Sequence, residues 1–311
     1  MDKVKLHILN SNIDQLPLGV MVIIPDKKPK AIVQISHDIM EYKERHIMFG
    51  EFLAKNGYLV VIHDHRGHGQ SAKDYEDLSF FYTQEKDALI EDLHQITGWI
   101  KEQYPKLPIY MIGQGFGGII AKLYLQKYDH ELSGLILTGF PSYTPKNHFY
   151  LFCSKIGYHI KGDHYRIKWI DRKCFTNNNK KLVNPKTKYD WMCKNRSIIY
   201  DYVFDNECGN LLTTSASLTY YKLLIDANKT RNYQKKNKEL PIYILLGGDS
   251  NRNIDMNHVE RNIKKFQRIG YKNIDYKVYT RMRHEVLNEN RKRVVYQDIL
   301  TFLNKQKKKQ N

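Results

Sequence analysis

Short apolar runs alternate with longer amphipathic stretches along most of the chain. Apolar runs rich in Val, Ile and Leu predict buried strands, and apolar positions at helical spacing predict helices packed against them. Strands that alternate with helices form a mainly parallel sheet with helices on both faces. Strands are expected at residues 20–24, 31–35, 58–62, 109–112, 134–138, 241–246 and 276–279, and helices at residues 42–55, 85–103, 119–124, 255–269 and 293–305.

The alternation stops in the middle of the chain. Residues 142–238 are rich in Tyr, Lys, Asn and Cys, and their helical signals are irregular. A stretch this long between two sheet strands is rarely a plain loop. We therefore predict a mostly helical cap at residues 142–238, inserted into a core made of residues 1–141 and 239–311.

Composition and charge narrow the class of protein. The chain has 311 residues, of which 41% are hydrophobic, and a formal net charge of +17. Basic residues occur all along the sequence without a zinc-finger or RNA-binding motif, so we expect a solvated lysine-rich surface and no nucleic acid. A weak association with anionic membranes is the alternative. Because no apolar run has the roughly 20 residues of a membrane span or the form of a secretory signal, we expect a cytoplasmic protein.

Four segments are expected to meet at one edge of the sheet. In open parallel sheets, ligand sites form beyond the carboxyl ends of the strands. The segments that follow such ends are Ser36-His37-Asp38, the turn after Ile112, the turn after Leu246 and the loop that holds His284. They place the candidate chemistry around one crevice.

The turn after Ile112 has the form of a nucleophile elbow without its nucleophile. The sequence Gly113-Gln114-Gly115-Phe116-Gly117 stands where G-x-S-x-G would present a reactive serine between a strand and a helix. Gly115 has no side chain, so it cannot form an acyl-enzyme. An elbow residue holds a backbone that costs a non-glycine residue about 1–3 kcal/mol, and glycine relieves that strain where catalysis is no longer needed.

Five short motifs, spread along the chain in the family's order, resemble the α/β-hydrolase superfamily. Within it they resemble the monoacylglycerol lipase and lysophospholipase-like branch, which is also called serine aminopeptidase S33. The resemblance implies an α/β-hydrolase fold: a mainly parallel eight-stranded sheet flanked by helices, with an inserted cap and no cofactor. The motifs are Asp64-His65-Arg66-Gly67-His68-Gly69-Gln70-Ser71 for D-x-R-G-x-G-x-S, His37-Asp38 for H-G, residues 113–118 for G-H-S-M-G-G, residues 246–251 for an S-G-x-x-D-P-like turn, and residues 283–289 for R-H-E-x-x-N-E.

The resemblance assigns three positions of a catalytic triad, and only the base is retained. His284 stands at the base position, Gly115 at the nucleophile position and Ser250 at the acid position. A neutral hydroxyl cannot stabilise a protonated imidazole as a carboxylate does. Asp249 would be a substitute acid if its loop shifted by one residue, and it equally suits a turn in Gly-Gly-Asp-Ser-Asn.

The oxyanion side of the site also departs from the family pattern. By position, the backbone N–H groups of Ile39 and Phe116 are the donors that would hold a developing oxyanion. His37, Asp38 and Gln114 are expected to line the pocket beside them. Asp38 replaces a glycine, and its negative charge would oppose an oxyanion.

Three further histidines suggest a metal site at first sight. His63 and His65 lie two residues apart on an extended segment, so they would point the same way, and His68 follows closely. The matching turn of the resembled family is structural. We therefore predict no metal.

These observations favour one function over two alternatives. The preferred function is a pseudo-hydrolase whose crevice persists and binds a lipid or acyl small molecule. The first alternative is an active ester hydrolase with relocated groups. In it, His284 would act with Asp249 as acid, and the nucleophile would be Ser36, Ser250 or a water activated by His284. The second alternative is a protein that acts through its basic surface.

Overall fold

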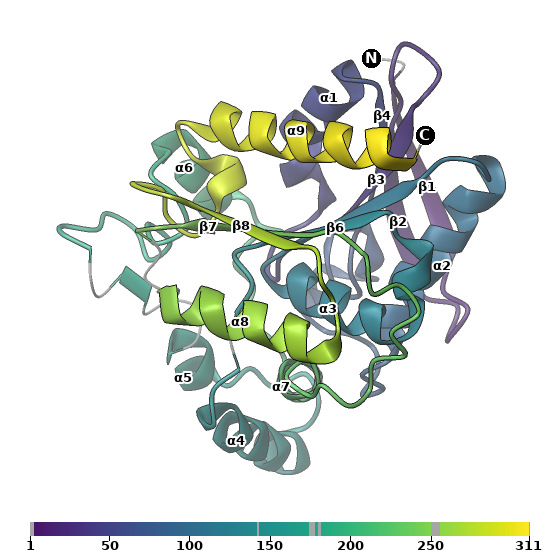
Figure 1. Cartoon of the computed structure of the whole chain (residues 1–311). Helices are drawn as coiled ribbons and strands as arrows, with labels where there is room; N and C mark the ends of the chain where they lie inside the picture. Colours follow the sequence, from purple (N-terminus) through teal and green to yellow (C-terminus); the bar gives the residue numbers. More distant parts are fainter. Residues whose placement is uncertain (1–2, 142, 174–177, 180–181, 250–255, 311) are drawn as a thin grey trace.

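The centre of the molecule is an eight-stranded sheet with the order β1-β2-β4-β3-β5-β6-β7-β8 (Figure 1). The computed structural model describes residues 3–141, 143–173, 178–179, 182–249 and 256–310. β2 pairs antiparallel with β1 and β4, and the other neighbours in the sheet pair parallel. The predicted fold class is therefore confirmed. The strands are β1 (Val4–Asn10), β2 (Pro17–Ile23), β3 (Ala31–Ser36), β4 (Tyr58–His63), β5 (Ile109–Gln114), β6 (Gly134–Thr138), β7 (Ile242–Gly247) and β8 (Ile274–Tyr279).

The strands that the sequence pattern predicted include the fully buried ones at the centre of the sheet. Every residue of β3, β4, β5 and β6 is buried, because helices cover both faces of the central sheet. Strands of this kind read as continuous apolar runs. β1 is an edge strand whose Leu6 and Ile8 are more than half exposed. The sequence pattern missed it, because its apolar and polar residues alternate over only seven positions.

Helices cover the two faces of the sheet (Figure 1). Two core clusters lie between these layers, one on each face. One face carries α1 (Ile47–Lys55) and α9 (Lys292–Gln310), and the other carries α2 (Ala88–Gln103), α3 (Phe116–Tyr128) and α8 (Met256–Ile269). Lys43–His46, the start of the helix predicted at residues 42–55, is a separate 3-10 turn.

Residues 142–238, which the sequence pattern predicted to be a mostly helical cap, hold helices in the part that the structure describes. These are α4 (Lys146–Lys161), α5 (Lys168–Asp171), α6 (Arg196–Phe204) and α7 (Thr214–Asp226). α4 packs along α7, and α7 contacts α3 of the core. Within the described residues, no helix combines the length and the apolar character that crossing a bilayer requires.

Candidate active site

The turn between β5 and α3 keeps the backbone of a nucleophile elbow. Gly115 has φ 52° and ψ −116°, a conformation that L side chains adopt only with strain. The strand and the helix also pack closely, since a Cβ on Gly117 would lie 2.0 Å from the Ser36 carbonyl oxygen. The chain therefore holds the sharp turn of the elbow with glycines alone.

The Asp38 carboxyl group occupies the space where a side chain at position 115 would begin. A Cβ built on Gly115 would lie 1.9 Å from Asp38 Cγ and 2.0 Å from both carboxylate oxygens. Real Cβ atoms do not approach other atoms so closely. A serine at position 115 and the present position of the Asp38 side chain therefore exclude each other.

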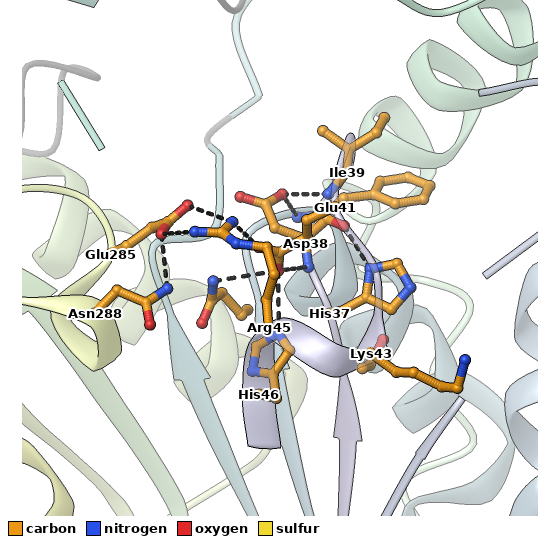
Figure 2. Close-up of polar contacts among 12 residues, drawn as sticks. His37, Asp38, Ile39, Glu41, Lys43, Arg45, His46, Glu285 and Asn288 are labelled. Atoms are coloured by element: carbon orange, nitrogen blue, oxygen red, sulfur yellow. Dashed lines mark hydrogen bonds and ion pairs between the residues drawn. The ribbon is translucent and has the colours of Figure 1, made fainter. Parts of the chain in front are cut away.

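Asp38 also fills the oxyanion position (Figure 2). Its Oδ1 accepts hydrogen bonds from the backbone N–H of Ile39 at 2.7 Å and of Phe116 at 2.6 Å. These are the two donors that the sequence assigned by position, and the structure brings them together on one oxygen. Phe116 is the first residue of α3, so the positive end of the helix dipole also favours the carboxylate. The hole thus holds an anion supplied by the chain itself.

His284 faces the second oxygen of this carboxylate. His284 Nε2 lies 3.6 Å from Asp38 Oδ2, and the two side chains are 1% and 8% exposed. The imidazole packs against the backbone of Gly139 and beside the ring of Trp191, with ring centroids 5.1 Å apart. The structure therefore assembles Gly115, Asp38 and His284 into one buried group.

A buried charge network joins the Asp38 loop to the His284 loop (Figure 2). Glu41 Oε1 accepts the backbone N–H of Asp38 at 2.8 Å, and Glu41 Oε2 accepts a hydrogen bond from Arg45. Arg45 Nη2 also lies 3.0 Å from the carboxylate of Glu285, the residue after His284. Burial by itself would raise the pKa of Glu41, but the Arg45 guanidinium, the His46 ring and the backbone N–H of Asp38 together outweigh it and hold that pKa at about 2. Glu41 and Arg45 therefore stay ionised, and their contacts connect the two loops.

Sequence reasoning did not single out Glu41, Arg45 or Glu285. Glu41 and Arg45 are four residues apart, a spacing typical of paired charges, but Glu285 lies 240 residues after Arg45. Gln114, which the sequence placed in the pocket, donates to Glu41 Oε1 at 3.4 Å. Its amide nitrogen therefore takes part in the network.

The histidines beneath the site act as neutral supports for its backbone. His37 Nδ1 donates to the Asp38 carbonyl at 2.6 Å, and its Nε2 accepts the His65 backbone N–H at 3.0 Å. His68 Nε2 accepts the backbone N–H of Met40, which has φ 62°. Burial lowers the pKa of His37, His65 and His68. Neutral imidazoles can both donate and accept, which is what these contacts require.

Metal binding finds no support in this cluster. Among the residues that the structure describes, no group of three or more His, Cys, Asp or Glu side chains is arranged to hold a metal ion.

Buried ion pairs hold the turn at residues 64–71, which carries the D-x-R-G-x-G-x-S motif. Lys43 Nζ lies 2.6 Å from Asp64 Oδ2, with both side chains fully buried. Arg66 is equally buried and contacts Asp92 at 2.5 Å and Asp14 at 2.6 Å. Each buried cation here has a carboxylate partner, which offsets the cost of removing it from water.

The acid side of the site is described only in part. Ser250 lies outside the described residues. The carboxylate of Asp249 lies 2.6 Å from Lys194 Nζ, and its side chain is 45% exposed. Ser36 Oγ is hydrogen-bonded to His65 Nε2 at 3.0 Å and is fully buried. The contacts described for these two candidates are therefore with Lys194 and His65.

The sheet order, the elbow and the histidine loop together define an α/β-hydrolase. The family model for serine aminopeptidase, S33 matches residues 27–291, and the chain belongs to this family. The resemblance drawn from the five motifs is confirmed.

Similar proteins include monoglyceride lipases and esterases. Monoglyceride lipase of Rattus norvegicus is 32% identical over 113 residues, which is 36% of this chain and 36% of that protein. Phospholipase YtpA of Bacillus subtilis is 22% identical over 284 residues, 88% of this chain and 95% of that protein.

Solved structures show the same fold at low identity. A thermostable carboxyl esterase of Bacillus coagulans in complex with glycerol has a TM-score of 0.89 at 24% identity, over 98% of this chain and 99% of the esterase. A monoglyceride lipase of Saccharomyces cerevisiae in complex with a substrate analogue has a TM-score of 0.73 at 21% identity, over 97% of this chain and 95% of the lipase.

Proposed function

We propose that this chain is a monoglyceride-lipase-like member of its family that has lost serine ester hydrolysis and binds a lipid or acyl molecule. One observation carries the first half of the proposal. The Asp38 carboxylate stands where the serine side chain would begin and also accepts both N–H groups of the oxyanion hole.

This arrangement opposes acyl transfer in two independent ways. Gly115 offers no oxygen to attack an ester, and loss of a catalytic nucleophile costs on the order of a million-fold in turnover. An ester carbonyl would also have to displace the negatively charged Oδ1 from the N–H groups of Ile39 and Phe116, where a charged acceptor binds more strongly than a neutral one.

The exposed side of α4 supports a lipid ligand. Phe149, Phe152, Ile156 and Ile160 recur at helical spacing on this helix and are between 42% and 70% exposed, and Trp169 of α5 is 42% exposed. An apolar stripe on a basic protein is typical of helices that lie on a membrane surface. It therefore also supports the weak association with anionic membranes.

Activity and binding measurements test the two halves of the proposal. A p-nitrophenyl ester and a monoacylglycerol should show no turnover, and a fluorophosphonate probe should not label the chain. Binding to monoacylglycerol-containing vesicles should weaken in Phe152→Asp. Met48→Asp, which changes an equally exposed apolar residue on α1, is the matched control and should bind like the wild type. Turnover typical of a serine hydrolase would overturn the loss of ester hydrolysis. Equal binding of the vesicles by Phe152→Asp and Met48→Asp would overturn the lipid-binding half.

A specific observation supports a second candidate function, in which Asp38 is a carboxylate nucleophile. Oδ1 sits in the oxyanion hole while Oδ2 faces His284 Nε2 at 3.6 Å. In this candidate, Oδ2 attacks a saturated carbon of an epoxide and forms an ester on Asp38. The carbon–oxygen bond of the ring breaks, and the resulting alkoxide takes a proton from water. Water deprotonated by His284 would then attack Asp38 Cγ, with the new oxyanion on Oδ1, and release the diol.

Mass spectrometry distinguishes this candidate from the binding function. Incubation of His284→Gln with a short terminal epoxide should then leave a stable adduct on Asp38, which the wild type would hydrolyse. A variant that remains unmodified would exclude the carboxylate nucleophile.

A further inference from the structure

A cavity with a strongly basic lining lies between α3, α7 and α8, and neither Asp38 nor His284 is among its lining residues. Its volume is about 260 Å³. Asn228, Asn262, Thr230 and Tyr143 add hydrogen-bonding groups, and the lining includes no Asp or Glu among the described residues. Its basic residues are Lys122 of α3 and Arg261, Lys265 and Arg268 of α8. We call this space the α3/α8 cavity.

Lys122 differs from the other buried cations of the molecule. Lys122 is only 6% exposed. Its ammonium group donates a hydrogen bond to a neutral acceptor, the amide oxygen of Asn262, at 3.2 Å. Lys43, Arg45 and Arg66 are buried to a similar degree, and each has a carboxylate partner. In the part of the chain that the structure describes, no carboxylate lies within ion-pair distance of Lys122.

The surroundings of Lys122 stabilise its charge only weakly. The ring centroids of Phe140 and Phe266 lie 5.2 and 5.6 Å from the ammonium nitrogen. A desolvated cation–π contact contributes about 2 kcal/mol, which is less than the several kcal/mol that burying an ammonium costs. Burial, together with the neighbouring Lys265 ammonium, lowers the pKa of Lys122 to about 7. Burial also lowers the pKa of Lys265 to about 8.

An anion in the cavity would supply the missing counter-charge. Three other basic side chains converge on the same space, so a group with more than one negative charge fits better than a single carboxylate. A phosphate monoester carries about −1.5 to −2 charges near neutral pH and several acceptor oxygens. The volume of about 260 Å³ lies slightly below the usual range for ligand pockets, which suits a small molecule rather than an extended one.

We propose that the α3/α8 cavity binds a small phosphate-bearing molecule through Lys122, Lys265 and the two arginines of α8. The site is separate from the Asp38 and His284 group, so it stands whether or not the proposed function of that group is correct. The phosphate belongs either to a free metabolite-sized ester or to the headgroup of a lipid.

Calorimetry on the full chain tests the proposal with inorganic phosphate and glycerol 3-phosphate as probes, at constant ionic strength against chloride. Both should bind the wild type. Lys122→Met should weaken binding by roughly tenfold or more, because a charge-assisted contact in a buried setting is lost. Lys264→Met removes one charge from the exposed side of the same helix and should change binding by less than about twofold.

Two further arms complete the test. Vesicles that contain phosphatidic acid identify the lipid source if they compete with glycerol 3-phosphate, and the free ester if they do not; either result supports the site. Circular dichroism of each variant verifies folding. Absence of phosphate binding by the wild type would overturn the proposal, and so would equal losses in Lys122→Met and Lys264→Met.

Discussion

Two regions of this molecule are built to attract an anion, and they differ in what fills them. The oxyanion hole holds the carboxylate of Asp38, which reaches it from the neighbouring loop and accepts both of its N–H groups. The α3/α8 cavity has four basic residues in its lining and no carboxylate among the described ones. The hole holds a carboxylate of the chain, and none of the described residues supplies one to the cavity.

The difference shows how one substitution can change the use of a site. The N–H groups of Ile39 and Phe116 would serve any oxyanion, but a residue with a short acidic side chain at position 38 satisfies them permanently. Buried donors without a partner cost about 1–3 kcal/mol each, so the carboxylate stabilises the folded state, and under the proposed function it also blocks ester chemistry. Lys122 has the opposite character, because its buried charge destabilises the folded state until an anion binds.

Emptying the hole should have the largest effect. Gly115→Ser alone should not react with a fluorophosphonate, because its Cβ would overlap the Asp38 carboxyl group. The double variant Asp38→Gly, Gly115→Ser frees both N–H donors. A fluorophosphonate should label it roughly a hundred-fold or more faster than Gly115→Ser alone. Labelling rates followed by intact mass measure this difference. Equal rates in the two variants would show that Asp38 does not block the hole.

Acid should destabilise the folded chain through His63, which is buried beside the ring of His65. Burial and the Lys43 ammonium lower the pKa of His63 to about 4, well below its ordinary 6.5. The unfolded chain therefore binds more protons than the folded one between these values, so stability falls as the pH falls from 6.5 towards 4. His63→Leu should lose less stability than the wild type between pH 7 and pH 5, by about 2 kcal/mol.

Urea unfolding at several pH values checks this difference. A His63→Leu profile parallel to the wild type would contradict the prediction.

Removing each charge should change stability in opposite directions. Asp38→Asn keeps one acceptor oxygen but loses the charge, so the free energy of unfolding should fall by about 1–2 kcal/mol. Lys122→Met replaces an uncompensated buried ammonium by an apolar side chain of similar length, so the same quantity should rise by about 1 kcal/mol. Chemical unfolding in phosphate-free buffer measures both. Shifts of the same sign would remove the contrast between the two regions.

The smallest effect is expected at Asp249. Its carboxylate forms a half-exposed ion pair with Lys194, and such pairs contribute about 0–1 kcal/mol. Asp249→Asn should therefore leave the labelling rate of the Asp38→Gly, Gly115→Ser variant unchanged. A large loss of labelling would show that Asp249 orients His284.

Much of the fold could be predicted from the sequence, because the central strands are buried on both faces. Residues 31–35 and 109–112 are continuous apolar runs for this reason. β1 could not be predicted in this way, since half of its side chains face water at the edge of the sheet.

The candidate site could be predicted only as far as sequence position allows. The motifs placed Ile39, Phe116 and Asp38 beside one another. They could not show that the Asp38 carboxylate turns into the hole, because that depends on the space left by Gly115. The contact of Arg45 with Glu285 depends on the folded chain, because it joins residues 240 positions apart.

The environment of Lys122 could not be predicted from the sequence either. The residue lies in an apolar helical run, and the basic residues that share its cavity come from α8, more than a hundred positions later.

The most direct test of the filled oxyanion hole is the amide proton chemical shift of Phe116. A backbone N–H that donates to a carboxylate at 2.6 Å resonates far downfield. We expect such a shift in the wild type, and an upfield move in Asp38→Asn that Gly98→Ala, a substitution in open space on α2, does not cause. An unchanged Phe116 resonance in Asp38→Asn would contradict the account.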